Sequence, residues 1–463
     1  MTHAGRTQHR LRTLRRAAAT LAAFLSACAP GPTEQPSRAT VMTSDLPPMR
    51  LFASHAGTPP LRSNDEIAQD FLDLAFRMES GRSIPIMTRF EGPISVRVAG
   101  DVPASLVPDL RALLTRLNTE AGVDIFLTGA PEAAVTIEAI PRAELAGAVP
   151  RAACFVVPRV SSWAEFRAAR HTPMVDWSTL TRRDRAVIFV PSDVAPQEIR
   201  DCLHEELAQA IGPLNDLYRL PDSVFNDDNI NAVLTGFDML VLRLYYSPEL
   251  ANGMTRGDAA ARLPALLARY NPAGQHPGNP MNDTSRDWID AIETALSSNE
   301  MPTRRRDAAE TAINLARAFG WDGPRKGFAL YAYGRLAISS NPDLALGAFL
   351  EAQRVFRQSP DTRLHEAHVA VQLCAFALRD GDAATVLALT EDAIPVAERG
   401  ENAALLASLM MFRAEALDLA GRPVEAQSVR LDSLAWARYG FGSEQNVRAR
   451  AREIAQLSPA SRG

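Results

Sequence analysis

Three turns in the C-terminal third of the chain recur 40 residues apart, and this period restricts the possible folds more than any other feature. The turns are Asn341-Pro342-Asp343, Gly381-Asp382-Ala383 and Gly421-Arg422-Pro423, and Pro302 extends the register backwards to a fourth copy. The small residues that return in phase after each turn are Ala308, Ala348, Ala388 and Ser428. Such a period is typical of stacked helical hairpins, because a single hairpin cannot bury its apolar face and a stack can.

Residues 283–455 are therefore predicted to form an all-α domain of about four 40-residue helical hairpins whose small residues let neighbouring helices approach closely. The pattern resembles tetratricopeptide-type repeats with somewhat longer helices. That resemblance implies a concave groove for a peptide segment or a protein partner. A non-repetitive helical bundle is the alternative, because the repeat assignment depends on three clear turns.

Residues 63–270 show a different pattern, in which short strands and helices alternate. A helix begins at the capping box Ser63-Asn64-Asp65-Glu66, and a leucine-rich helix spans Leu106–Leu117. The predicted strands are Ile94–Val98, Val135–Ile140, Cys154–Val157 and Arg185–Val190. Pro191-Ser192-Asp193 ends the last strand and is expected to cap the next helix. This order predicts an α/β domain with a mixed sheet, which the Pro-, Gly- and Asn-rich linker 271–282 ends.

The first 27 residues have the pattern of a lipoprotein signal peptide. Five arginines and no acidic residue accompany an apolar run, Ala17–Ala27, that is too short to span a bilayer. The run ends in Leu25-Ser26-Ala27-Cys28, which resembles a bacterial lipobox, so Cys28 is the predicted lipidation site. Residues 28–62 hold seven prolines and are predicted to be an extended tether. An ordinary secretory signal cut near Ala27 is the alternative, and either signal directs the chain out of the cytoplasm.

These signals predict a protein of the cell envelope that is lipid-anchored to the membrane and faces the periplasm, and Ala29 after the cysteine favours the outer membrane. Without residues 1–27 the chain has 44 basic and 54 acidic residues, a net charge of −10. Such an acidic chain is a poor candidate for binding nucleic acid. Cys154 and Cys202 lie in one predicted domain, and an oxidising compartment permits a disulfide between them. Cys374 lies on a helical apolar face and is predicted to be a core residue.

The stretch CLHEELAQAIGPLND, residues 202–216, contains a His-Glu pair on a predicted helix. The zinc-peptidase motif H-E-x-x-H, begun at His204, needs a second histidine four residues later. That position holds Ala208, which cannot bind a metal. The literal reading therefore fails, and His204 is expected to be a surface residue or to support another side chain.

A shift by one residue produces the spacing of a longer signature, H-E-x-x-H-x-x-G-x-x-H, which is that of the metzincin proteases. In this register Glu205, Gln209 and Asn215 stand where the three metal-binding histidines belong. Glu206 stands at the catalytic base and Gly212 at the turn that leads to the third ligand. Since residues four apart share one face of a helix, Glu205 and Gln209 are able to approach a common point.

The segments after this motif resemble those of matrixin-like metzincins. Ser223-Val224-Phe225 resembles the methionine turn beneath the metal, with Phe225 in place of methionine, and residues 234–245 resemble the start of the closing helix. This resemblance implies a degenerate, zincin-like α+β domain. Residues 150–260, with an extension back to 63, also look like an uncharacterised family of proteobacterial lipoproteins known only as domain of unknown function 2927. No activity is established for that family, so this second resemblance implies no reaction.

The substituted positions favour a protein without a catalytic metal. Zinc sites use imidazole, thiolate or carboxylate ligands, whereas this motif offers one carboxylate and two amides. The candidate oxygen ligands for another cation are Glu205, Gln209, Asn215 and Asp216, with help from Asp222, Asp227 or Asp228. A solvated helix end with its cap is the simpler alternative. No cofactor is expected, and zinc in particular is not.

The sequence thus leads to three functional hypotheses. The first is a binding or scaffolding protein in which a protease-like domain keeps a peptide cleft and the helical repeats bind a protein or peptide. The second is an active metallohydrolase that uses Glu206 as general base and oxygen ligands for its metal. The third is a structural lipoprotein whose first domain is only a spacer. Zinc content and chelator-sensitive peptidase activity distinguish the first hypothesis from an enzyme.

Overall fold

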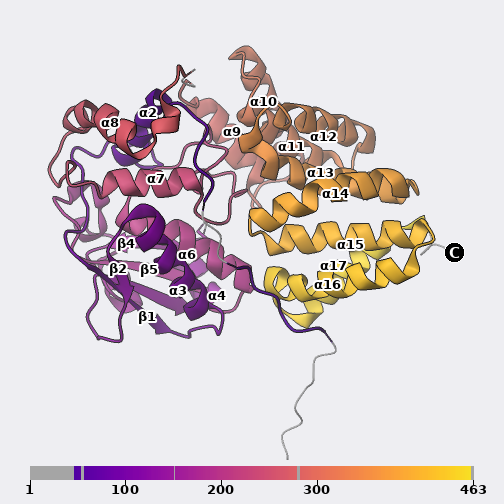
Figure 1. The fold of residues 1–463 in the computed structure, drawn as a ribbon, viewed down its shortest axis with the longest axis horizontal. Coiled ribbons are helices and arrows are strands. Elements are labelled where there is room, and N and C mark those ends of the chain that lie inside the picture. The colour runs from indigo at the N-terminus through magenta and orange to yellow at the C-terminus, as the bar shows by residue number, and fades with distance from the viewer. Residues whose placement is uncertain (1–45, 54–56, 151, 279–281, 460–463) are drawn as a thin grey trace, which may run out of the picture. The chain divides into compact units, whose positions relative to one another are not determined.

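The computed structural model describes residues 46–53, 57–150, 152–278 and 282–459. The predicted signal peptide and the lipidation site Cys28 lie outside these residues. Along the described chain a mixed α/β region is followed by an all-helical region (Figure 1). None of the described helices combines the length and the apolar character that crossing a bilayer requires.

A five-stranded sheet in the order β2-β1-β3-β5-β4 organises the α/β region. Its strands are β1 Ile94–Gly100, β2 Ile125–Leu127, β3 Val135–Ile140, β4 Phe155–Pro158 and β5 Ala186–Pro191. All neighbouring strands are parallel except β4 and β5, which are antiparallel. The predicted mixed sheet is therefore confirmed. The sequence pattern missed β2, because three residues are too few to show alternation.

Helices cover both faces of this sheet. The helices of the α/β region are α2 Asn64–Ala75, α3 Leu106–Arg116, α4 Arg142–Ala148, α5 Trp163–Ala169, α6 Pro196–Ile211, α7 Gly236–Tyr245 and α8 Arg256–Tyr270, and α3, α4 and α6 contact the strands. Ile188 and Val190 of β5 join the core formed with α3 and α6, whereas Val187 and Phe189 pack with α4 and α5. Successive residues of a strand face opposite sides of the sheet, and both sides are covered at β5. All of its residues are therefore buried, and its sequence is continuously apolar. The sequence pattern did not indicate α4 and α5, since seven residues are too few to show a helical period.

The two predicted helix caps have different outcomes. The capping box of α2 is present, because Ser63 and Glu66 each accept a hydrogen bond from the other's backbone N–H. The predicted cap of α6 is wrong, because the helix begins after Ala195. The Asp193 carboxylate instead accepts a hydrogen bond from the N–H of Arg142, 2.8 Å away, at the start of α4. A proline in the first turn of α6 favours that start, since its fixed φ suits the helix and its missing donor is not needed there.

The described residues after 282 form a helical repeat-like region. Its helices are α9 Arg286–Leu296, α10 Pro302–Ala318, α11 Pro324–Ala337, α12 Pro342–Phe356, α13 Arg363–Arg379, α14 Ala383–Arg399, α15 Ala403–Leu419, α16 Pro423–Phe441 and α17 Glu444–Ala455. From α10 onwards they form consecutive pairs, and each helix packs on the next along the chain (Figure 1). The predicted all-α character of this region is confirmed, with α9 as an additional helix that packs on α10.

The second helical pair is one residue longer than the sequence period assumes. The caps of the first helix in each pair are Met301, Asn341, Asp382 and Arg422. Because of this shift Ala388 and Ser428 are exposed, although Ala348 is buried. The prediction that small residues at 388 and 428 line helix contacts is therefore wrong. The equivalent buried residues near the start of α12, α14 and α16 are Ala345, Val386 and Ala426.

Part of the predicted tether packs against α16. Phe52 stacks on Trp436, with ring centroids 4.4 Å apart. The backbone N–H of Arg50 donates a hydrogen bond to the carbonyl oxygen of Ala435 at 3.2 Å. Residues 46–53 are therefore held by aromatic and backbone contacts that their irregular sequence did not indicate.

Candidate functional site

Helix α6 carries the motif residues and is fastened to the rest of the α/β region in two ways. A disulfide joins Cys202 of α6 to Cys154 next to the edge strand β4. At the C-terminal end of α6, the Arg183 guanidinium donates hydrogen bonds to three backbone carbonyls in residues 209–212, at 2.6 to 2.8 Å. The last carbonyls of a helix lack partners within it and carry partial negative charge, so a buried cation there is a strong anchor.

Gly212 allows the chain to leave α6 where a side chain would not fit. A Cβ at this position would lie 2.5 Å from the Leu242 side chain of α7 and 2.9 Å from the carbonyl oxygen of Ala208. Those distances are shorter than van der Waals contact, so the turn at the end of α6 requires glycine. This turn leads the chain directly to residues 215 and 216.

Glu206, at the predicted position of the catalytic base, is buried with 5% of its surface exposed. Its Oε2 atom has no hydrogen-bond partner among the described residues. Burial raises the pKa of Glu206 well above its ordinary value, and the charges of Glu205 and Glu79 raise it further. A raised pKa favours the protonated form, and a protonated carboxyl group cannot accept a proton from water, so burial works against Glu206 as a general base.

The four candidate oxygen ligands do not converge as a set. The Gln209 amide donates to Asp216 Oδ2 at 3.2 Å, whereas the Asn215 amide donates to the carbonyl oxygen of Asp73 in α2 at 2.9 Å. The charges of two other acidic side chains, Glu79 and Asp227, act on Glu205. No group of three or more His, Cys, Asp or Glu side chains in the described ranges is arranged to hold a metal ion. These residues do not fit zinc, because two of the three substituted positions are amides already engaged within the protein.

The alternative of a solvated helix end is wrong for Gln209 and Asn215. Gln209 and Asn215 are 7% and 5% exposed, and both are held by the hydrogen bonds just described. The end of α6 and the loop that follows it are therefore buried in the α/β region. Burial of these polar groups requires partners, since an unpaired amide inside a protein is costly.

Acidic side chains from several segments gather beside the C-terminal half of α6. We refer to Glu79, Glu205, Glu206, Asp216 and Asp227 as the acidic cluster. Burial, together with repulsion from other carboxylates, raises the pKa values of Glu205 and Asp227 to about 7. The same causes raise the pKa of Asp216 well above its ordinary value. Like charges in a region with little water disfavour one another's ionisation, so these groups form one electrostatic unit.

Glu79 is the member of the acidic cluster that the sequence analysis missed. It lies in a turn after α2 that an antiparallel bridge between Arg77 and Ser83 shapes. The side chain is exposed and lies far from α6 in the sequence. No local signal marks an exposed glutamate in a turn as functional, because its importance depends on a contact between distant segments.

The acidic run 222–228 divides among three environments. Asp227 joins the acidic cluster. Asp222 accepts a hydrogen bond from Arg62 at 2.8 Å, and Asp228 lies 2.8 Å from His365 Nε2 in α13. Only Asp227 therefore contributes to the candidate site, and the other two residues hold neighbouring segments in place.

His204 is a core residue, so the first of its two expected positions, on the surface, is wrong. It is 2% exposed, and its Nδ1 accepts a hydrogen bond from the N–H of Leu234 at 3.1 Å. Burial lowers the pKa of His204 well below its ordinary value, and the charges of Arg200 and Arg116 lower it further. The neutral ring therefore ties α6 to the segment before α7.

The segment that resembles a methionine turn is built into the core next to α7. Phe225 is fully buried. Ser223 Oγ donates a hydrogen bond to Asp238 Oδ1 at 2.5 Å, and the N–H of Val224 donates to Asp238 Oδ2 at 3.1 Å. Asp238 also belongs to the capping box that begins α7 with Thr235. One buried carboxylate thus fixes the turn, and with it the segment that carries Asp227, against a helix.

A cavity of about 1010 Å³ opens beside the acidic cluster. Its lining includes residues 77–81, 215–219 and parts of 227–229 from the α/β region, and residues between 283 and 300 from the helical region. Glu79, Asp216 and Asp227 are part of this lining. A cavity of this volume is large enough for several side chains or a short peptide segment.

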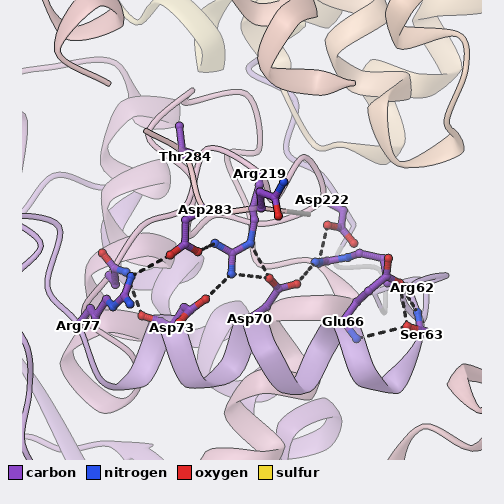
Figure 2. A network of polar contacts seen from close by, with 12 residues as sticks. Arg62, Ser63, Glu66, Asp70, Asp73, Arg77, Arg219, Asp222, Asp283 and Thr284 are labelled. Atoms are coloured by element: carbon purple, nitrogen blue, oxygen red, sulfur yellow. Dashed lines mark hydrogen bonds and ion pairs between the residues drawn. The ribbon is translucent and has the colours of Figure 1, made fainter. Parts of the chain in front are cut away.

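An ion-pair network around the buried Arg219 (Figure 2) shares three residues, Arg77, Arg219 and Asp283, with the lining of this cavity. The Arg219 guanidinium is 2% exposed and donates to Asp70 at 2.9 Å, to Asp73 at 2.7 Å and to Asp283 at 3.2 Å. Asp70 and Asp73 project from α2 toward Arg219, and Asp70 also pairs with Arg62. The network therefore connects the loop after α6 with α2 and with the start of the helical region.

Residues 64–265 match a family model described as protein of unknown function (DUF2927). The match begins with α2 and ends in α8, so it includes the sheet, α6 and the whole acidic cluster but not the helical region. The predicted resemblance to this family is therefore confirmed for these residues. No curated protein and no solved structure matches the chain.

Within the matched residues, Glu205→Gln is expected to stabilise the protein above about pH 7 and to change little near pH 4. The pKa of Glu205 is about 7 in the folded chain, against an ordinary value of 4.5. The contribution of Glu205 to stability is therefore complete below its unfolded pKa and is lost as the pH rises through its folded pKa. The shift corresponds to at most about 3 kcal/mol at alkaline pH.

Urea denaturation of the wild type and of Glu205→Gln across this pH range measures the effect. Glu132→Gln is the control, because Glu132 is exposed and lies outside the acidic cluster. A difference between wild type and Glu205→Gln that stays constant with pH would contradict the electrostatic origin of the instability.

Proposed function

We propose that this chain is a lipid-anchored, periplasm-facing binding or scaffolding protein whose protease-like domain has lost its zinc site. The lipobox-like sequence before Cys28 supports the anchor. The metzincin-like spacing of residues 205–215 supports descent of the α/β region from a peptide-binding frame. The helical repeat-like region supports a role in binding a protein or peptide partner.

The observation that carries the proposal is that two former ligand positions are used for contacts within the protein. Gln209 is bound to Asp216, and Asn215 is bound to the backbone of α2. A catalytic zinc needs three protein ligands that converge and leave one position open for water. Here those amides hold the loop after α6, while a large cavity remains beside it. A cleft without its metal is suited to binding rather than to hydrolysis.

Purified full-length protein is expected to contain no stoichiometric zinc and to show no peptidase activity that a chelator removes. Elemental analysis by mass spectrometry and an assay with a fluorogenic peptide library measure these two properties. Stoichiometric zinc together with chelator-sensitive cleavage would overturn the proposal in favour of the hydrolase. In that case Glu206→Gln should abolish cleavage without a loss of thermal stability, since the replacement keeps the shape and removes only an acidic group.

A further inference from the structure

The basic side chains that line the cavity beside α6 are already neutralised. Each of its three lining arginines is held in ion pairs at 2.7 to 3.2 Å. These pairs are Arg77–Asp283, Arg219–Asp73 and Arg286–Glu293. A cation engaged by a carboxylate at such a distance has little charge left for other groups. The remaining charge of the lining is therefore set by its unpaired carboxyl groups.

Glu79, Asp216 and Asp227 are lining residues that form no ion pair with a basic side chain in the described part of the chain. They come from three segments, namely the turn after α2, the loop after α6 and the segment before α7. Arg286 is the basic residue whose charge acts on Asp227, but it is already held by Asp290 and Glu293. The cavity therefore presents several carboxyl groups without an internal counter-ion.

Two buried carboxyl oxygens beside this cavity also lack hydrogen-bond donors. They are Oδ1 of Asp216, which is part of the cavity lining, and Oε2 of Glu206, which lies in α6 and is not part of the lining. Glu206 is 5% exposed, and the charge of Glu79, a lining residue, acts on it. Buried polar atoms almost always have partners, so the unpartnered oxygen of Asp216 in the cavity wall points to a donor that comes from outside the chain.

We propose that this cavity binds the cationic side chains of a partner, as lysines or arginines of an extended peptide segment. The inference rests on the proposed binding function and names the chemistry of the ligand. An ammonium group brings three N–H donors and a guanidinium group five, together with the positive charge that the acidic cluster lacks. The site would thus supply carboxylates from the acidic cluster, and the partner would supply charge and donors.

A basic peptide suits the site better than a metal ion does. No three acidic side chains of the described residues are close enough to coordinate one ion. The cavity has room for several side chains, whereas a single ion would fill only a small part of its roughly 1010 Å³. Its lining also continues along α9, which gives an extended segment a second wall.

Fluorescence anisotropy of a labelled pentapeptide with two arginines, titrated with the full chain at neutral pH and low salt, tests the proposal. The same peptide with citrulline in place of arginine keeps the shape and removes the charge. The arginine peptide is expected to bind at least about tenfold more tightly than the citrulline peptide, and less tightly as salt is added. Equal affinity for the two peptides would overturn the proposal.

The site is located with the double variant Glu79→Gln, Asp227→Asn, which is expected to weaken binding of the arginine peptide about tenfold or more. The charge-matched control is Asp124→Asn, Glu132→Gln, because both residues are exposed and lie outside the cavity lining. The control is expected to bind like the wild type. Glu79→Gln alone removes an exposed side chain and should also weaken binding, so the test does not depend on the folding of the double variant. Unchanged binding in both cavity variants would overturn the proposal.

Two further probes distinguish other cations from a peptide. The first probe is calcium chloride alone. Stoichiometric calcium binding that excludes the arginine peptide would overturn the proposal in favour of a metal site. The second probe is spermine. Tighter binding of spermine than of the arginine peptide would overturn the proposal in favour of a polyamine site. Cleavage of the bound peptide by a zinc-containing protein would instead refute the loss of the zinc site and leave cationic recognition intact.

Discussion

Replacing Arg219 with methionine is expected to lower the free energy of unfolding by about 3 to 5 kcal/mol. The variant leaves Asp73 and Asp70 buried in α2 without the guanidinium that lies between them. Removing one partner of a buried ion pair costs more than the pair itself contributes, because the remaining charge is buried without compensation. Asp73 keeps a second contact with Arg256 and Asp70 keeps Arg62, which limits the loss.

The destabilisation caused by Arg219→Met should grow as the pH rises. Burial already raises the pKa of Asp70, and the charges of Arg62 and Arg219 oppose that rise. Loss of Arg219 therefore raises the pKa of Asp70 further. A carboxyl group whose folded pKa is raised contributes stability below its unfolded pKa and loses it as the pH rises through the folded value. The variant is expected to be closest to the wild type in mild acid.

Chemical denaturation of Arg219→Met at several pH values measures both expectations. Arg77→Met is the matched control, because Arg77 contacts the same Asp283 but is 46% exposed at its side chain. An exposed ion pair contributes at most about 1 kcal/mol, so the control should be close to the wild type. Similar losses for the two arginine variants would show that the buried network is not the source of stability.

The second large effect is expected for Arg183→Met, with a loss of about 3 to 5 kcal/mol in the free energy of unfolding. The Arg183 guanidinium donates to the carbonyl oxygens of Gln209, Ala210 and Gly212, and it lies 4.9 Å from the centre of the Trp177 ring. Methionine fills part of the space but donates no hydrogen bond. Three buried carbonyls at the negative end of α6 would then lack partners.

Arg182→Met is the control for Arg183→Met, because Arg182 is the adjacent residue and its side chain is 68% exposed. The control should change stability by less than about 0.5 kcal/mol. Hydrogen exchange of the amides in residues 205–216 gives a local readout, and faster exchange is expected there in Arg183→Met. Unchanged exchange in this segment would mean that Arg183 does not hold the end of α6.

Local patterns in the sequence predicted most of the regular structure. The alternating residues of β1 and the apolar runs of β3 and β5 marked strands, because their periods are visible within a few residues. The short elements β2, α4 and α5 carry too few residues to show a period. The turn motifs recur at a constant spacing, although the helical pair before Asp382 is one residue longer. The spacing of the turns therefore did not reveal this shift.

The candidate site was predicted only in part. The motif register drew attention to Glu205, Gln209 and Asn215, and the first two do lie on one side of α6 beside other polar groups. Asn215 faces α2 instead, because the turn at Gly212 directs it to a backbone carbonyl. Sequence spacing describes distances along a helix, but it does not describe where the chain goes after the helix ends.

By itself the sequence determined the division into an α/β region and a helical region, the mixed sheet and the helix that carries the motif. These properties follow from the period of apolar residues and from caps and turns, which are local. The tertiary structure alone decided that Glu79 and Asp227 meet the residues of α6 beside a large cavity. It also decided which carboxyl groups have raised pKa values. Both depend on how distant segments pack and exclude water, and neither leaves a trace in local sequence.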